Sequence, residues 1–212
     1  MNVLLIAGPT HVPLDEARSI INRSTGKTGL VIAELFHKAG HSVSLWLGEG
    51  TTHPLPTSLN RPTQFHTLTD LERLILKTDL TAFDVILLPA ALPDYELHQA
   101  LGPDNHPLPT KKWPGSLPKI LIELRPSSRV LPTLRSKAPK AKIIGWKWEA
   151  GVTSEEAFNA AKQQCLSCKT SASVLNGPAY GTGYLMISAE GENVPCADAQ
   201  ALGEALLRFL KG

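Results

Sequence analysis

The sequence has little cysteine, few aromatic residues and no long apolar run. Its 212 residues include 3 cysteines, and aromatic residues make up 6% of the chain. Three cysteines cannot build a framework of paired disulfides, which favours a reducing compartment. The N-terminus lacks a basic segment, and its apolar run ends at Ala7, so we expect neither a signal peptide nor a membrane-spanning helix. These absences predict a cytoplasmic protein with no membrane partner.

A large excess of one charge sign is also missing. The net charge of +2 is too small to indicate nucleic-acid binding. The stretch from Lys111 to Lys147 is nevertheless basic, with Glu123 as its single acidic residue. A cationic stretch among apolar runs suits either an anionic ligand or a solvated basic face. Because these cations fall within expected strands and helices, we do not expect nucleic acid as a partner.

The first fifty residues have the pattern of a strand, a helix and a second strand. Residues 2–7 form a continuous apolar run, which is typical of a buried strand in a parallel sheet. Apolar residues then recur at helical spacing as far as Gly40, and Val43, Leu45 and Leu47 alternate. This βαβ opening predicts an α/β fold with a doubly wound, mostly parallel Rossmann-like sheet.

The remaining chain continues the alternation of strands and helices in one domain, residues 1–212. Further strands are expected at 65–68, 83–88, 120–124, 142–148, 172–175 and 184–187. Helices are expected at 69–78, 127–136, from the capping-box match at 153–156 to about 164, and at the C-terminus. The first of these opens on another capping-box match, Thr69–Glu72. Residues 96–118 hold five prolines and two glycines without periodicity, which predicts a flap-like excursion.

The loop between the first strand and the first helix is rich in turn formers and small residues. It ends in Ser-Thr-Gly-Lys-Thr-Gly, residues 24–29, and such a loop can bind phosphate on backbone N–H groups at a helix N-terminus. A Walker A motif would need glycine where Ile21 stands. The dinucleotide fingerprint GxGxxG is missing too, because Gly8-Pro9-Thr10 follows the first strand. The loop therefore belongs to neither of these two classes.

Residues 7–29 resemble the signature of the phosphopantothenoylcysteine synthetase (phosphopantothenate–cysteine ligase) family, AGGT-x-E-x-ID-x-VR-x-ISN-x-SSGK-x-G. Pro9 replaces a glycine, Thr25 replaces a serine, and the family acid near Val12 is absent. The matching residues are Ala7, Gly8, Thr10, Asp15, Arg18, Asn22, Ser24, Thr25, Gly26, Lys27 and Gly29.

Four later segments resemble family motifs in the same order along the chain. Residues 89–95 are similar to A-A-A-V-x-D-Y, and residues 123–131 to E-L-V-K-N-P-D-I-L. Residues 144–149 are similar to V-G-F-K-x-E, and residues 174–177 to V-A-N-D. The co-linear matches cover nearly the whole chain, which is far more specific than any single motif.

The resemblance implies a ligase of coenzyme A biosynthesis. Such an enzyme uses CTP or ATP, with Mg²⁺, to activate the carboxylate of 4′-phosphopantothenate as an acyl-nucleotide, and the amine of cysteine then displaces the nucleotide. It also implies a homodimer, without a fused flavin-dependent decarboxylase and with a separate decarboxylase protein as a possible partner. Several fixed cations and backbone donors are needed to hold a triphosphate and a second phosphate.

The resemblance assigns roles to particular residues. Asn22 would contact the acyl-nucleotide, Arg18 would help to hold its loop, and Lys112, with Lys111 beside it, would be the catalytic lysine of the flexible loop. Gly145 and Trp146 would lie beside the base. The other nucleotide-binding residues would be Gly8, Thr10, Ser24, Thr25, Gly26, Lys27, Ala90, Ala91, Asp94 and Lys169. No metal ligand is assigned.

Two departures from the family pattern leave alternatives open. Trp113 and Pro114 stand where later loop lysines are expected, and Gln164 and Cys168 stand where the family has lysines before V-A-N-D. One alternative is therefore a degenerate member that binds a nucleotide or a phosphopantetheine-like ligand without ligation. A less favoured alternative is an NAD(P)-dependent reductase that uses the βαβ opening with Glu49 as the ribose-binding acid.

Overall fold

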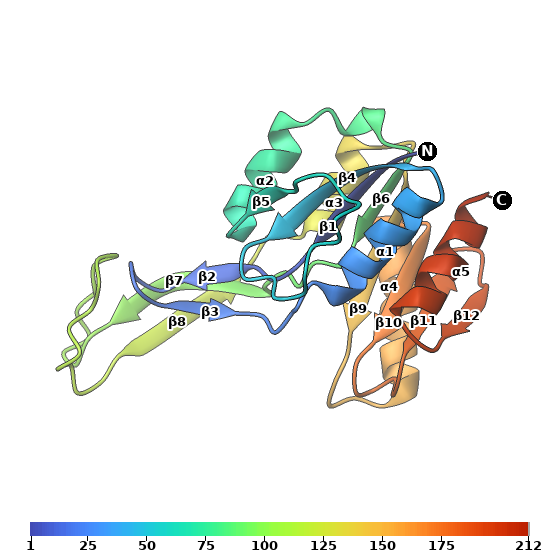
Figure 1. Cartoon of the computed structure of the whole chain (residues 1–212). Coiled ribbons are helices and arrows are strands. Elements are labelled where there is room, and N and C mark those ends of the chain that lie inside the picture. The colour runs from blue at the N-terminus through green and yellow to red at the C-terminus, as the bar shows by residue number, and fades with distance from the viewer. Residues whose placement is uncertain (212) are drawn as a thin grey trace.

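A central eight-stranded sheet organises the chain in a computed structural model, which describes residues 1–211 (Figure 1). The strand order is β12-β11-β10-β9-β6-β1-β4-β5. The parallel strands are β1 (Asn2–Ala7), β4 (Ser42–Gly48), β5 (Thr63–Phe65), β6 (Val85–Leu88), β9 (Lys142–Trp148) and β10 (Ala172–Asn176). At one edge β11 (Tyr184–Ser188) and β12 (Asn193–Cys196) run antiparallel. The predicted doubly wound, mostly parallel sheet is confirmed.

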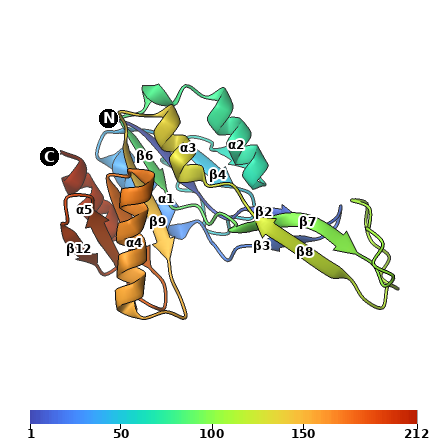
Figure 2. The ribbon, with the colours of Figure 1, turned by 180° about the vertical axis from the view of Figure 1, so that it is seen from behind.

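Helices cover both faces of this sheet (Figures 1 and 2). On one face α1 (Lys27–Lys38) and α5 (Ala199–Lys211) form a core with Leu5 of β1. On the other face α2 (Leu68–Lys77) and α3 (Val130–Lys137) pack on Leu4, and α4 (Ser154–Cys168) packs on β10 and β11. Leu4 and Leu5 are both fully buried, which explains why β1 is apolar without alternation.

Helix starts agree with the capping patterns, with one correction. Thr153 and Glu156 form the expected capping box, and α4 runs on to Cys168 rather than ending near Gln164. The box of α2 is Thr67 with Asp70, not the segment beginning at Thr69. The hydroxyl of Thr67 accepts from the N–H of Asp70, and this earlier start leaves β5 at residues 63–65 instead of 65–68.

The excursion predicted at residues 96–118 does leave the sheet, but its first residues form a strand instead of a loop. β7 (Tyr95–Leu101) pairs antiparallel with β8 (Leu121–Pro126), and this hairpin projects from the sheet (Figures 1 and 2). β2 (His11–Pro13) and β3 (Ser19–Ile21) form a shorter hairpin alongside it. We call residues 11–21 and 95–126 the arm. The strand expected at 120–124 therefore belongs to the arm and not to the central sheet.

Candidate active site at the carboxyl edge of the sheet

The loops that follow β1 and β6 are joined at the carboxyl edge of the sheet. The N–H of Ala91 donates to the carbonyl of Gly8 at 2.9 Å. The N–H and the hydroxyl of Thr10 both donate to the carbonyl of Ala91, at 3.2 and 2.8 Å. Thr10 is 1% exposed, so its hydroxyl is used to join the two loops. The edge lies where the strand order reverses, which is the usual ligand position in doubly wound sheets.

Asn22 connects the same edge to the signature segment. It follows β3, and its Nδ2 donates to the carbonyl of Leu92 at 2.8 Å. Leu92 belongs to the loop that also holds Ala90 and Ala91. Asn22 therefore lies between the loop after β6 and the phosphate loop that begins at Ser24.

Residues 24–27 form an open turn at the N-terminus of α1. Gly26 is the N-cap residue with φ 76°, no side chain caps the helix, and its first turn has no acidic residue. The hydroxyl oxygens of Ser24 and Thr25 accept from the N–H groups of Gly26 and Lys27, both at 3.3 Å. Each hydroxyl keeps its own proton for a ligand oxygen. With the ammonium group of Lys27 exposed, this turn suits an anion.

Thr51, in the loop after β4, packs against Gly8 and against Gly26 of the predicted phosphate loop. A Cβ on Gly8 (φ +88°) would lie 2.5 Å from Thr51 Oγ1, and one on Gly26 would lie 2.6 Å from Thr51 Cγ2. Thr51 in turn donates to the carbonyl of Gly48 at 2.8 Å. Both glycines are thus required by a close approach as well as by positive φ. Nothing in the sequence pattern marks Thr51, which stands in a long polar loop.

Gly145 and Trp146 are the predicted site residues on β9. As neighbours in a strand they point to opposite faces of the sheet, Gly145 toward α3 and α4 and Trp146 toward the core of α1 and α5. A Cβ on Gly145 would lie 2.6 Å from Gln164 Oε1 and 2.9 Å from Leu131, so this position is filled by helix packing. Gln164 also donates to the carbonyl of Trp146 at 3.2 Å and accepts from Ser173 at 2.8 Å. Gln164, where the family has a lysine, therefore acts as a cross-link between α4 and the sheet. Gly145 offers a ligand only its main chain.

Asp94 lies where the arm leaves the sheet. Its side chain is exposed, and its carbonyl accepts from the N–H of Ser127 at 3.0 Å. The hydroxyl of Ser127 donates to the carbonyl of Pro93. These bonds join the two strands of the long hairpin at their base, and they leave the carboxylate of Asp94 facing solvent near the loop of Ala90 and Ala91.

Arg18 and Lys112 lie together, but on the arm rather than in the phosphate loop. Arg18 pairs with the carboxylate of Asp15, and its Nη2 donates to the carbonyl of Trp113 at 3.4 Å. The N–H of Lys112 donates to Glu16 Oε2 at 3.3 Å. The resemblance had assigned Arg18 to the loop of Asn22, but in the structure its partners are Asp15 and the loop that carries Lys112.

The buried carboxylate of Asp15 fixes this junction of the two hairpins. Its side chain is 0% exposed and accepts from the N–H groups of Ala17, Arg18 and Trp113, at 2.8, 2.8 and 2.9 Å. Burial raises the pKa of Asp15, but these N–H donors and the charge of Arg18 outweigh it and hold the pKa below the usual 3.8. Trp113 is itself 2% exposed. The loop that carries Lys112 is thus held in place by the buried Trp113 next to it.

Lys169 is a correction, because the structure places it away from the other predicted residues. It ends α4 in a left-handed conformation, with φ 52°, and its carbonyl accepts from Arg135 Nε at 2.9 Å. α4 runs antiparallel to the strands, so its C-terminus reaches the amino ends of the parallel strands. Lys169 therefore lies at the edge opposite the phosphate loop.

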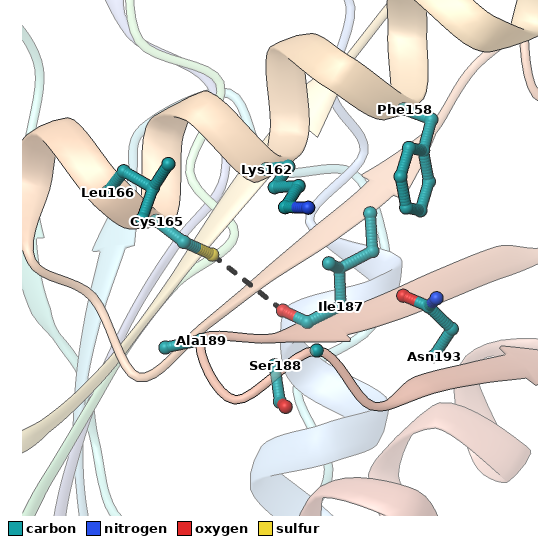
Figure 3. A pocket seen from close by; sticks show the side chains of 9 residues that line it. Phe158, Lys162, Cys165, Leu166, Ile187, Ser188, Ala189 and Asn193 are labelled. Carbon is teal, nitrogen blue, oxygen red and sulfur yellow. Dashed lines mark hydrogen bonds between the residues drawn. The ribbon is translucent and has the colours of Figure 1, made fainter.

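A small cavity near that opposite edge is not a candidate active site. It measures about 70 Å³ and lies between α4 and the β11–β12 turn (Figure 3). Cys165 lines it and donates its thiol to the carbonyl of Ile187 at 3.7 Å. Burial raises the pKa of this thiol, which disfavours the reactive thiolate.

Fold and loops together define a Rossmann-like α/β protein whose first helix begins without a side-chain cap near the strand-order reversal. Residues 1–186 match the sequence model of the DNA/pantothenate metabolism flavoprotein C-terminal domain, and the chain belongs to this family. It is 28% identical over 163 residues to the coenzyme A biosynthesis bifunctional protein CoaBC of Thermococcus kodakarensis, covering 76% of this chain and 38% of that protein. It is 43% identical over 61 residues to the protein of that name from Haemophilus influenzae, covering 29% and 15%. The chain spans well under half the length of these relatives.

Solved structures share the fold. The DNA/pantothenate metabolism flavoprotein from Streptococcus pneumoniae superposes with a TM-score of 0.85 at 20% identity, over 100% of this chain and 98% of that one. The C-terminal domain of a CoaBC protein superposes with a TM-score of 0.74 at 22% identity, over 99% and 93%. Within residues 1–211, no helix has both the length and the apolar character needed to span a membrane.

Proposed function

We propose that this chain is a phosphopantothenate–cysteine ligase of coenzyme A biosynthesis, which joins 4′-phosphopantothenate to cysteine through an acyl-nucleotide. One observation carries the proposal. Within the family signature, Thr10 and Asn22 bond to the loop after β6, and residues 24–27 form the uncapped N-terminus of α1 at the same carboxyl edge of the sheet. The segments that we assign to the nucleotide and to its phosphates therefore lie on one edge.

The phosphate loop supplies the donors that a polyphosphate needs. The protons of Ser24 and Thr25, the first N–H groups of α1 and the ammonium group of Lys27 converge on one turn. A triphosphate with its Mg²⁺ fits such a turn because fixed donors stabilise phosphate charge without rearrangement. CTP and ATP share this moiety, so the loop serves either nucleotide.

Asn22 and Asp94 border the place where the nucleoside and the reacting carboxylate would meet. Asn22 is held between the phosphate loop and the loop after β6 by its bond to Leu92. The N–H groups of Ala90 and Ala91 donate to the carbonyls of Ile6 and Gly8, so we assign the nucleoside contact of this segment to the exposed Asp94. Asn22 is therefore placed to contact an acyl-nucleotide at its phosphate-to-carboxyl linkage, and Trp146 to border the base.

The arm supports a homodimer. Large apolar side chains that are 40–55% exposed gather on it, namely Ile20, Ile21, Tyr95, Leu121, Ile122 and Leu124. Several exposed large apolar side chains on one element are typical of a protein interface. A second copy of the chain would cover it, and Ile122→Glu should then convert a dimer to a monomer in light scattering, with Leu76→Glu on α2 as the exposed control.

The reductase alternative has lost its support. The carboxylate of Glu49 lies 3.2 Å from Nδ1 of His66, whose ring stacks on His11. The chain also belongs to the DNA/pantothenate metabolism flavoprotein C-terminal domain family. The degenerate-member alternative keeps a specific observation in its favour, because Lys112 lies on the arm and Gln164 replaces a lysine.

The deciding experiment measures pyrophosphate release with 4′-phosphopantothenate, cysteine, Mg²⁺ and either CTP or ATP. We expect turnover with one nucleotide, a loss of at least about 100-fold in Asn22→Ala, and no change in the exposed control Asn60→Ala. Folded protein that binds a nucleotide but releases no pyrophosphate would be the degenerate member.

The remaining proposals concern the setting and the partner of the enzyme. We propose a cytoplasmic setting, which suits the free thiols of all three cysteines. The product of the ligase would be the substrate of a separate decarboxylase.

A further inference from the structure

A hydroxyl pair joins the phosphate loop to a strand at the far side of the sheet. Thr28 stands in the first turn of α1, and Tyr184 begins β11, 156 residues later. Their oxygens are 2.7 Å apart and half-buried. This is a strong hydrogen bond between neutral groups, and it fixes the first turn of the helix against the sheet.

We propose that Thr28 binds a phosphate oxygen of the nucleotide and that Tyr184 is the residue that positions its hydroxyl. The inference rests on the proposed function. The pair holds two O–H protons but uses only one between its oxygens. The phenol of Tyr184 is the more acidic hydroxyl and so donates to Thr28 Oγ1. The proton of Thr28 is then free, and it lies beside the open N-terminus of α1.

The surroundings favour an anion as the acceptor of that proton. The first turn of α1 has no acidic residue and no side-chain cap that competes for it. Lys27 precedes Thr28 and is exposed, so positive charge borders the pair. A hydroxyl that already accepts one hydrogen bond is a better donor in its turn, because bonds in a chain polarise one another.

Trp146 provides a second unused donor on the same sheet face. Val174 of β10 faces both Trp146 and Met186, so Tyr184, two residues before Met186, shares the face of Trp146. The indole N–H of Trp146 is buried and, among residues 1–211, has no hydrogen-bond partner. Unsatisfied donors of this kind are rare in folded proteins, and this one lies at the carboxyl edge that the nucleotide would occupy.

Neither member of the pair belongs to the matched family positions. Thr28 occupies the variable position of SSGK-x-G, and Tyr184 lies outside the segments that resemble family motifs. The contribution of the pair can therefore be tested separately from that of Ser24, Thr25 and Lys27.

Calorimetric titration of CTP, ATP and inorganic tripolyphosphate, each with Mg²⁺, tests the pair. We expect Thr28→Val to weaken binding of the bound nucleotide and of tripolyphosphate about tenfold, and Tyr184→Phe about threefold. Thr28→Ser should restore wild-type affinity, because it keeps the hydroxyl. The double variant should bind no more weakly than Thr28→Val alone. Tyr180→Phe, on the opposite face of the sheet, is the matched control.

The outcomes separate the inference from the proposed function. Wild-type affinity in both Thr28→Val and Tyr184→Phe would overturn the inference and leave the ligase proposal intact. Additive losses in the double variant would overturn the positioning role, since Tyr184 would then act without Thr28. A Thr28→Ser variant as weak as Thr28→Val would show a packing role and overturn it as well. Wild-type protein that binds none of the three ligands would overturn both proposals.

Discussion

The sheet and the arm are stabilised in opposite ways. Five of the six residues of β1 are buried, and its side chains enter the cores on both faces. Every residue of β8 on the arm is exposed. The arm instead depends on a single buried junction, where Asp15 and Arg18 of the short hairpin hold Trp113 of the long one. The sheet therefore gives the site its rigid rim, and the arm carries Arg18 and Lys112 on a separately ordered element.

The largest expected difference between the two regions lies in global stability. Leu5→Ala removes a fully buried side chain from β1 and should lower the free energy of unfolding by about 3 kcal/mol. The same change at Leu124 of β8, which is 40% exposed, should lower it by less than about 1 kcal/mol. Urea denaturation measures both. Equal losses would contradict the comparison, because they would mean that Leu124 contributes as much to stability as the fully buried Leu5.

A local opening of the arm should follow from loss of Trp113. Trp113→Ala empties a site that is 2% exposed, and truncation of a buried tryptophan removes about 3 kcal/mol of stability. We expect amide hydrogen exchange to rise about 100-fold in residues 109–113 and 14–18, while β1 and β6 keep their protection. Trp148→Ala, at a position 62% exposed, is the matched control and should change neither region. Faster exchange throughout the sheet would contradict the view that the arm opens independently of the sheet.

Acidification should release the same junction through Asp15. Because its pKa is lowered in the folded protein, its ionised carboxylate contributes stability above the usual 3.8, and this is lost as the pH falls through the lowered value. The charged group that pairs with it is Arg18, and the N–H groups of Ala17, Arg18 and Trp113 donate to it. Fluorotryptophan NMR of Trp113 should show release only below the usual aspartate range. Asp15→Asn should release the loop at every pH, and Asp104→Asn should behave as wild type.

Most of the sheet was predictable because burial leaves a trace in the sequence. The apolar run of residues 2–7 and the spacing around Leu202 and Leu206 place β1 and α5 correctly. The arm left no such trace, since its strands are exposed and its junction depends on one aspartate and one tryptophan 98 residues apart.

The candidate site likewise contains residues that the sequence could predict and residues that it could not. The resemblance to a family singled out Thr10, Asn22 and residues 24–27, which lie at the carboxyl edge, but also Arg18, which lies on the arm. Thr51 and Tyr184 were not predictable, because only the folded sheet brings them to the phosphate loop. Lys169 was misplaced because a register of motifs does not show that α4 continues to the opposite edge.

The smallest expected effect concerns the boundary between sheet and arm. Thr10→Val removes the buried hydroxyl that donates to Ala91, while the N–H of Thr10 still serves the same carbonyl at 3.2 Å, so the loss should be limited to about 1 kcal/mol. Ser127→Ala removes the corresponding hydroxyl bond to Pro93 at the half-buried base of the arm, and we expect a loss below about 0.5 kcal/mol. Urea denaturation distinguishes the two, and Thr10→Ser should retain wild-type stability. A larger loss of unfolding free energy in Ser127→Ala than in Thr10→Val would contradict this comparison. The base of the arm would then be as well stabilised as the sheet edge.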